Sequence, residues 1–312
     1  MEKRRFQNKV ATSGFTLPVA ASFTTLLWCA EGIYTLNRLW GWVLCAVMTY
    51  LWIETNNAYS LLRIRSRLTS AIFVFLTGCM FSLHPLQDSL FVSCLMLGSY
   101  YLIFKSYQQT NVSVCFLHTF LCIGLGSLLF PQLLYFAPFY FWYASVYLRS
   151  LTWHSFWAGL TGLILPYWFM AGYALYTGEI SILKAHFCEL TNFRAFSLET
   201  YLQHPPLQAA IIGLIVIFSL VASIHYIRTS FNDKIRTRMF MYLILFQEFL
   251  ITLFLILQPM HFGILSGLLI MNSAPILSHF FALTGSKLTN AAFILFLVLF
   301  TVLSLLNIWI QL

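Results

Sequence analysis

The chain has 312 residues, of which 60% are hydrophobic and only 8% are charged. A soluble domain carries roughly 25% charged residues, so this composition excludes an ordinary globular protein. The net charge of +8 would suit a nucleic-acid partner. However, the basic residues lie in short connectors between apolar runs, where they set membrane orientation, so we expect no nucleic acid.

Apolar runs of about 20 residues recur along the chain, and each can cross a hydrocarbon core about 30 Å thick. The sequence therefore predicts an all-α, polytopic integral membrane protein, with one transmembrane domain over residues 1–312 and about 11 transmembrane helices. In chain order, the predicted spans cover residues 15–34, 39–54, 68–83, 89–104, 112–130, 132–148, 153–176 and 207–227, then two arms of a hairpin within 239–287 that turns at 258–261, and finally 288–310.

The basic residues also predict an orientation. If the amino terminus is cytoplasmic, all lysines and arginines except Arg38, Lys184 and Arg194 fall on the cytoplasmic side. Such an excess of inner positive charge is typical of membrane proteins, and a wrong span count would scramble it. We therefore expect an N-in, C-out arrangement.

The longest polar connector covers about residues 178–206 and would be extracytoplasmic. Within it, Ile180, Leu183, Phe187 and Leu190 follow spacings of three, four and three. These spacings place the four side chains on one face of a helix, which predicts an amphipathic helix on the membrane surface.

The same connector holds a candidate outer-loop site made of Lys184, His186 and Arg194. Their side chains could contact the phosphates of a lipid-linked substrate. The alternative is a solvated loop without a ligand. His186 and Glu189 form a His-x-x-Glu pair, but further ligands at defined spacing are missing, so we expect no metal site and no cofactor.

A candidate intramembrane polar site lies in the hairpin, halfway along its two arms. It consists of Gln247, Glu248, Asn272, Ser273 and His279. Because a carboxyl group at membrane depth is costly, Glu248 needs an explanation. Antiparallel arms could bring Glu248 and Asn272 together, as a proton- or cation-coupled site or as a hydrogen-bonded group that fixes helix packing. Pro275 would weaken the second arm locally.

Several apolar motifs support a family resemblance. They lie in the block 116–179, at Leu125–Pro131, Leu148–Trp153 and Gly162–Pro166, and in the closing stretch Ala274–Phe281 with Lys287. With these motifs the chain resembles an uncharacterised family of multi-pass inner-membrane proteins of Bacteroidota. The resemblance implies a bacterial inner-membrane location, and it transfers no activity and no catalytic residues.

Three functions remain open at this point. The first is an envelope-associated accessory or assembly protein, whose partners would be membrane lipids and other membrane proteins. The second is a polytopic enzyme acting on lipid-linked glycans at the outer face, in the manner of a polymerase or glycosyltransferase. The third is a small-solute or ion transporter that uses Glu248. No complete catalytic constellation is visible, so the sequence favours a protein that is not an enzyme.

Overall fold

The computed structural model describes residues 5–109, 111–193 and 205–311. The protein is all-helical, with 84% helix and no strand in these segments, which confirms the predicted fold class. Five helices are long and apolar enough to cross a membrane, at Trp153–Thr177, Pro206–Asn232, Ile235–Leu257, Pro259–Leu283 and Lys287–Ile310. A bent pair, Phe6–Thr12 with Thr16–Glu31, would make a sixth. The count of about 11 and the orientation stay predictions.

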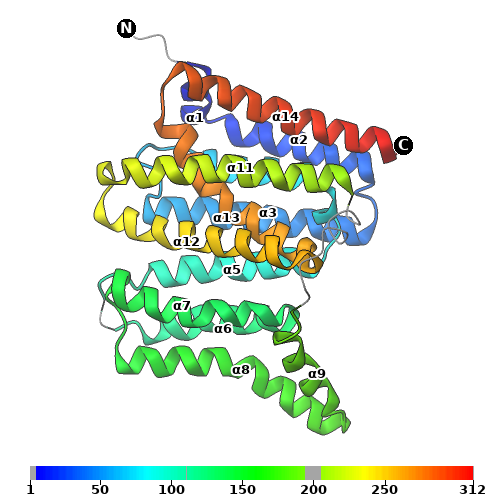
Figure 1. The fold of residues 1–312 in the computed structure, drawn as a ribbon, viewed down its shortest axis with the longest axis vertical. Helices are drawn as coiled ribbons and strands as arrows, with labels where there is room; N and C mark the ends of the chain where they lie inside the picture. The colour runs from blue at the N-terminus through cyan, green and yellow to red at the C-terminus, as the bar shows by residue number, and fades with distance from the viewer. Residues whose placement is uncertain (1–4, 110, 194–204, 312) are drawn as a thin grey trace. The chain divides into compact units, whose positions relative to one another are not determined.

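The described part of the chain contains thirteen α-helices (Figure 1). They are α1 (Phe6–Thr12), α2 (Thr16–Glu31), α3 (Leu36–Tyr59), α4 (Leu68–Cys79), α5 (Asp88–Phe104), α6 (Ser113–Leu129), α7 (Phe136–Tyr143), α8 (Trp153–Thr177), α9 (Ser181–Leu190), α11 (Pro206–Thr229), α12 (Ile235–Leu257), α13 (Phe262–Leu283) and α14 (Lys287–Gln311). Short helical turns join some of them, at η1 (Phe81–Leu83), η2 (Pro131–Tyr135), η3 (Ala144–Leu148), η4 (Ser230–Asn232) and η5 (Pro259–His261).

The helices form two compact units. The first comprises the described residues of Met1–Leu90 and Phe196–Leu312, and the second those of Phe91–Ala195. The prediction of a single transmembrane domain over residues 1–312 stays a prediction.

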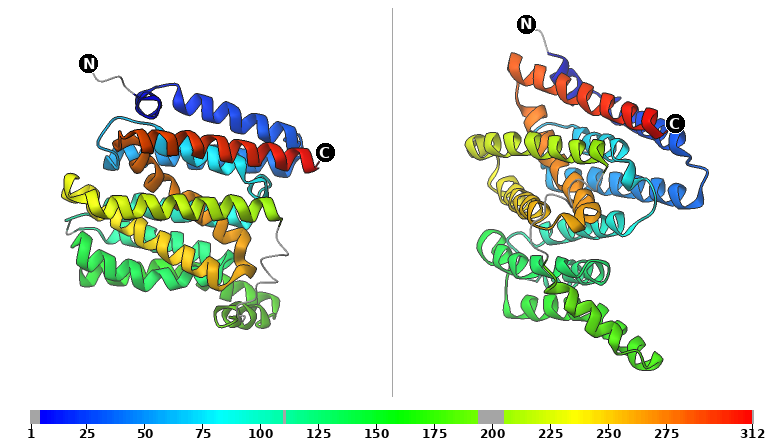
Figure 2. Two further views of the ribbon diagram at one scale, coloured as in Figure 1. Left: turned by 45° about the horizontal axis from the view of Figure 1, so that its top comes forward. Right: turned by 45° about the vertical axis from the view of Figure 1, so that its right-hand side comes forward.

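Helix α13 is the core of the first unit. It packs against α1, α4, α11 and α12, and it crosses α11 and α12 obliquely (orange in Figures 1 and 2). In the most apolar stretch of this helix 94% of the residues are buried, against 28% for both α11 and α14. A helix that is hydrophobic all round is expected inside a bundle, where every face meets protein. Its polar side chains must therefore find partners on neighbouring helices.

Pro275 does not interrupt α13, which runs unbroken from Phe262 to Leu283. Proline cannot donate to the carbonyl four residues earlier, so one backbone hydrogen bond is lost at this point. Serines on either side of Pro275 bond back to the helix. Ser273 Oγ lies 2.7 Å from Leu269 O, and Ser278 Oγ donates to Pro275 O at 2.9 Å.

In the second unit, α6 and α8 touch through glycines. A Cβ atom added at Gly162 would lie 2.2 Å from Leu117 O, and one added at Gly124 would lie 2.8 Å from Leu163 O. Both distances are far too short for a side chain, so the two backbones are in direct contact, a close approach that small residues allow. Between α6 and α8, the predicted span 132–148 is divided into η2, α7 and η3.

Helix α9 occupies the predicted amphipathic segment. Leu183 and Leu190 are half-buried, whereas Ile180 and Phe187 are exposed. The C-terminal end of α9 is held by η2, since Gln132 Nε2 donates to Glu189 O at 3.1 Å and the Tyr135 hydroxyl donates to Leu190 O. A helix thus lies where the spacing predicts one. Its place on a membrane surface stays a prediction.

Candidate functional site

Glu248 lies on α12 and faces α13 with both carboxyl oxygens bonded. Asn272 Nδ2 donates to Glu248 Oε2 at 2.9 Å, and Ser273 Oγ lies 2.6 Å from Glu248 Oε1. Asn272 Nδ2 also donates to Ile244 O, one turn before Glu248 on α12, at 2.7 Å. These contacts confirm the predicted proximity of Glu248 and Asn272. We call Glu248, Asn272 and Ser273 the mid-helix cluster.

The hydrogen count in the mid-helix cluster favours a neutral carboxyl. The Ser273 hydroxyl has one hydrogen but lies within hydrogen-bond distance of two acceptors, Glu248 Oε1 and Leu269 O. Both contacts can be hydrogen bonds at once if Glu248 carries a proton and donates it to Ser273 Oγ, while that hydroxyl donates to Leu269 O. In addition, no Lys, Arg or His among the described residues forms an ion pair with Glu248. A buried carboxyl without a cationic partner is most stable uncharged.

Two of the predicted site residues fall outside this cluster. His279 is not a partner of Glu248, which corrects the prediction that grouped them. It lies seven residues beyond Asn272, and seven residues span about 10 Å of helix. Gln247 is fully buried beside Glu248 on α12. The functional role of this group of residues stays a prediction.

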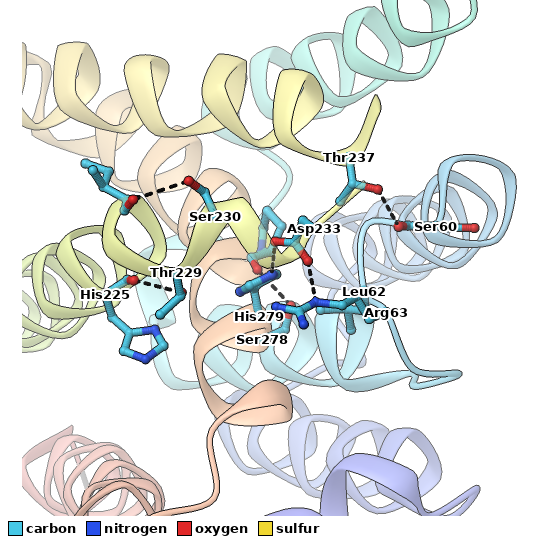
Figure 3. Close-up of polar contacts among 12 residues, drawn as sticks. Ser60, Leu62, Arg63, His225, Thr229, Ser230, Asp233, Thr237, Ser278 and His279 are labelled. Carbon is cyan, nitrogen blue, oxygen red and sulfur yellow. Dashed lines mark hydrogen bonds and ion pairs between the residues drawn. The ribbon is translucent and has the colours of Figure 1, made fainter. Parts of the chain in front are cut away.

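His279 instead joins a second buried carboxyl, Asp233, in the turn between α11 and α12 (Figure 3). His279 Nε2 lies 3.0 Å from Asp233 Oδ2, and Arg63 Nε, from the connector between α3 and α4, is paired with Asp233 Oδ1. The ring of Tyr226 packs edge-on against His279 at 4.7 Å. We call Arg63, Asp233 and His279 the connector cluster, because it ties two connectors to the core helix α13.

The charge state of the connector cluster follows from its partners. Burial raises the pKa of the Asp233 carboxyl. The hydrogen bonds and positive charge supplied by His279 and Arg63 lower this pKa by more than burial raises it. The net result is a pKa below the ordinary value, so Asp233 is ionised at neutral pH. The connector cluster therefore holds a buried, ion-paired carboxylate, whereas the carboxyl of the mid-helix cluster has only uncharged partners.

Sequence reasoning missed Asp233. A signal was present, because Asp233 is the only acidic residue in a connector that also holds Arg228, Lys234, Arg236 and Arg238. A lone acid among cations at a predicted span end indicates an ion pair. Its partner Arg63 could not be identified in this way, because it lies 170 positions away.

Of the candidate outer-loop residues, the structure describes Lys184 and His186, and the site that they were predicted to form with Arg194 stays a prediction. His186 Nε2 lies 3.3 Å from the Tyr167 hydroxyl, which in turn donates to Ser127 Oγ at 2.7 Å. This contact half-buries His186, and the burial lowers the pKa of its imidazole more than nearby Glu189 raises it. Lys184 is exposed, two positions away, and so points elsewhere around α9. Arg194 lies outside the described residues.

A third carboxyl group, Glu31, ends α2 and is also bonded. It pairs with Nδ1 of the buried His84 and, at 3.3 Å, with Arg38 Nη2. His84 Nε2 contacts Gly78 O at 3.1 Å, and the Trp28 ring stacks on the imidazole at 3.8 Å. Because Gly78 O can only accept, His84 Nε2 donates to it, and Nδ1 faces the Glu31 carboxyl. This pairing fixes the chain between α4 and α5 against α2.

No group of three or more His, Cys, Asp or Glu side chains in the described segments is arranged to hold a metal ion. Two cavities in the first unit have volumes of about 1030 and 530 Å³, and Glu248 lines neither. The Glu248 carboxyl therefore contacts its neighbours Asn272 and Ser273 and is not part of the lining of either cavity.

No family model, no curated protein and no solved structure matches the chain.

Proposed function

We propose that the chain is a multi-pass protein of a bacterial inner membrane that acts as an envelope-associated accessory or assembly protein and not as an enzyme. The proposal includes about 11 spans with the amino terminus inside and the carboxyl terminus outside. The short helix α4 is compatible with this count because all of its residues are buried, so that it need not match the thickness of the bilayer. The resemblance to inner-membrane proteins of Bacteroidota supports the location.

The observation that carries the proposal is the way in which the polar residues of the spans are used. Both oxygens of Glu248 are bonded by its own neighbours, and Asn272 is also bonded to the backbone of α12. Transport through Glu248 would require a carboxyl that faces a cavity and exchanges partners during the cycle. The mid-helix cluster instead supports a role in holding α12 and α13 together.

The enzyme alternative has less support. An enzyme for lipid-linked glycans would need cations gathered at the outer face to hold a phosphate. Lys184 and His186 point in different directions from α9, and His186 is bonded to Tyr167. These positions support a packing role for His186 and place Lys184 on a different side of α9.

Deletion of the chain in its native cell tests the proposal. We expect at least one multi-subunit envelope complex to migrate faster or to disappear in native electrophoresis of solubilised membranes. Re-expression of the wild-type chain and of Glu248→Gln should both restore it, since the glutamine keeps the contacts of the mid-helix cluster. Lipid-linked glycans, measured in the same membranes by mass spectrometry, should be unchanged. Unaltered complexes together with an accumulated glycan intermediate would reject the accessory role in favour of the enzyme.

A further inference from the structure

The larger of the two cavities is strongly basic. It has a volume of about 1030 Å³ and is lined by the connector between α3 and α4, by the start of α12 and by the bend between α1 and α2. Four cationic side chains line it: Arg63, Arg65, Arg67 and Lys234. We call it the basic cavity.

Most of this positive charge is not neutralised by the protein. Arg63 is paired with Asp233, but Arg65, Arg67 and Lys234 form no ion pair with any carboxylate in the described segments. Cations gathered in a concave site raise the local concentration of anions. The basic cavity therefore has the charge to hold a doubly charged phosphate group.

The backbone that carries the arginines is held in place. Asn56 Nδ2 donates to Ser66 O at 3.1 Å, and Asn56 Oδ1 accepts from the Leu62 amide at 3.3 Å. Thr237 Oγ1 donates to Ser60 O at 3.2 Å, and the Leu62 side chain is buried. Because these contacts order the connector without a ligand, little conformational entropy is lost when an anion binds.

An apolar cavity adjoins the basic one. It has a volume of about 530 Å³ and lies between α1, α2, α4 and α14, with Phe23, Phe75 and Phe296 among its walls. Ser13 lines both cavities, and Arg67 of the basic cavity is followed directly by Leu68 of the apolar one. The two cavities thus meet at the bend between α1 and α2.

The bend itself is fixed by the protein. Helices α1 and α2 meet at 93°. The buried side chain of Gln7 anchors α1, because its Nε2 donates to Phe281 O and to Thr284 at the end of α13. A short helix at right angles to a span is the arrangement expected at a membrane interface, with its apolar side toward the acyl chains.

We propose that the two cavities together bind an anionic, phosphate-bearing lipid. The phosphate lies in the basic cavity against Arg65 and Arg67, and an acyl chain lies in the apolar cavity between α2 and α14. The predicted orientation places this site in the cytoplasmic leaflet, where anionic lipids attract basic segments. The proposal rests on the membrane location proposed above but not on the accessory role.

Lipid binding to the purified full chain in neutral detergent tests the proposal, with thermal stability and native mass spectrometry as readouts. We expect phosphatidylglycerol to bind at least about tenfold more tightly than phosphatidylcholine, since each surface cation contributes about 1 kcal/mol to attraction of an anionic lipid. Arg65→Gln with Arg67→Gln should weaken phosphatidylglycerol binding by about tenfold or more. Both arginines are exposed, so the double variant should fold as the wild type does.

A matched variant separates the site from general charge. Lys105→Gln with Lys287→Gln removes the same two charges from exposed positions outside both cavities and should leave phosphatidylglycerol binding within about twofold. Ala20→Trp, which fills the apolar cavity, should weaken lipid binding, and glycerol 3-phosphate should bind much more weakly than the lipid. Equal losses in the two double variants would overturn the proposal, as would glycerol 3-phosphate binding as tightly as phosphatidylglycerol. Because these measurements use the purified chain, they are independent of the deletion experiment.

Discussion

The mid-helix cluster and the connector cluster are two solutions to the same problem. In each of them a buried carboxyl contacts the core helix α13. Glu248 is bonded to an amide and a hydroxyl, Asn272 and Ser273. Asp233, by contrast, is bonded to two groups that can carry positive charge, Arg63 and His279.

The position of a buried carboxyl along its helix determines whether its partners are neutral or charged. Halfway along α12 and α13, far from the connectors, neutral partners and a protonated carboxyl avoid the cost of a buried charge. At the ends of the helices, Arg63 can reach Asp233 while its own side chain stays 40% exposed, so an ionised carboxylate is retained. The two clusters should therefore respond differently to substitution and to pH.

The largest effect is expected at the connector cluster. Asp233→Ala should lower the free energy of unfolding by about 3 kcal/mol, because removing one member of a buried ion pair leaves the His279 and Arg63 donors without their acceptor. Denaturant titration in mild detergent measures this change. Glu179→Ala removes an exposed carboxylate and should change stability by no more than about 0.5 kcal/mol. If Asp233→Ala lowered the free energy of unfolding no more than Glu179→Ala, the stabilising role of the connector cluster would be contradicted.

Glu248→Ala should cost somewhat less, about 2 kcal/mol. The substitution leaves a cavity between α12 and α13 and removes the partner of Asn272 and Ser273, but both of these residues keep a backbone acceptor, at Ile244 and Leu269. The same titration measures it. If Glu248→Ala proved more damaging than Asp233→Ala, the ranking of the two clusters would be reversed.

The pH dependence should separate the clusters further. The pKa of Asp233 is lowered in the folded protein from its ordinary value of 3.8, so its contribution to stability is fully present above pH 3.8 and is lost as the pH falls through the lowered value. The stability difference between wild type and Asp233→Asn should therefore shrink on acidification, by at most about 1.4 kcal/mol per pH unit. A difference that stays constant down to the pH of acid unfolding would argue against an ionised Asp233.

The smallest effect is expected for Glu248→Gln. The glutamine oxygen can still accept from Asn272, and its amide group can donate to Ser273 Oγ in the way that a protonated carboxyl does. We expect a change of less than about 0.5 kcal/mol in the free energy of unfolding. A loss close to that of Glu248→Ala would mean that the carboxylate charge is required.

The sequence predicted the helical class, the hairpin and the contact between Glu248 and Asn272. The lengths of the apolar runs can be read from the sequence, and so can the similar distances of these two residues from the turn at 258–261. It also indicated a helix at residues 180–190 from the spacing of four apolar side chains. The partners of His279 could not be predicted, because they depend on which connectors meet at the end of α13. For the same reason the basic cavity was invisible, since Ser13, Arg65 and Lys234 come from three separate segments.

Infrared difference spectra at neutral pH test most directly whether the Glu248 carboxyl of the mid-helix cluster is uncharged. Subtracting the spectrum of Glu248→Gln from that of the wild type should reveal a protonated carboxylic-acid carbonyl band, whereas subtracting Asp233→Asn should reveal carboxylate bands. A carboxylate signal from Glu248 would contradict the account, because an ionised carboxyl inside the bundle would need a cationic partner, and no Lys, Arg or His of the described segments forms an ion pair with Glu248.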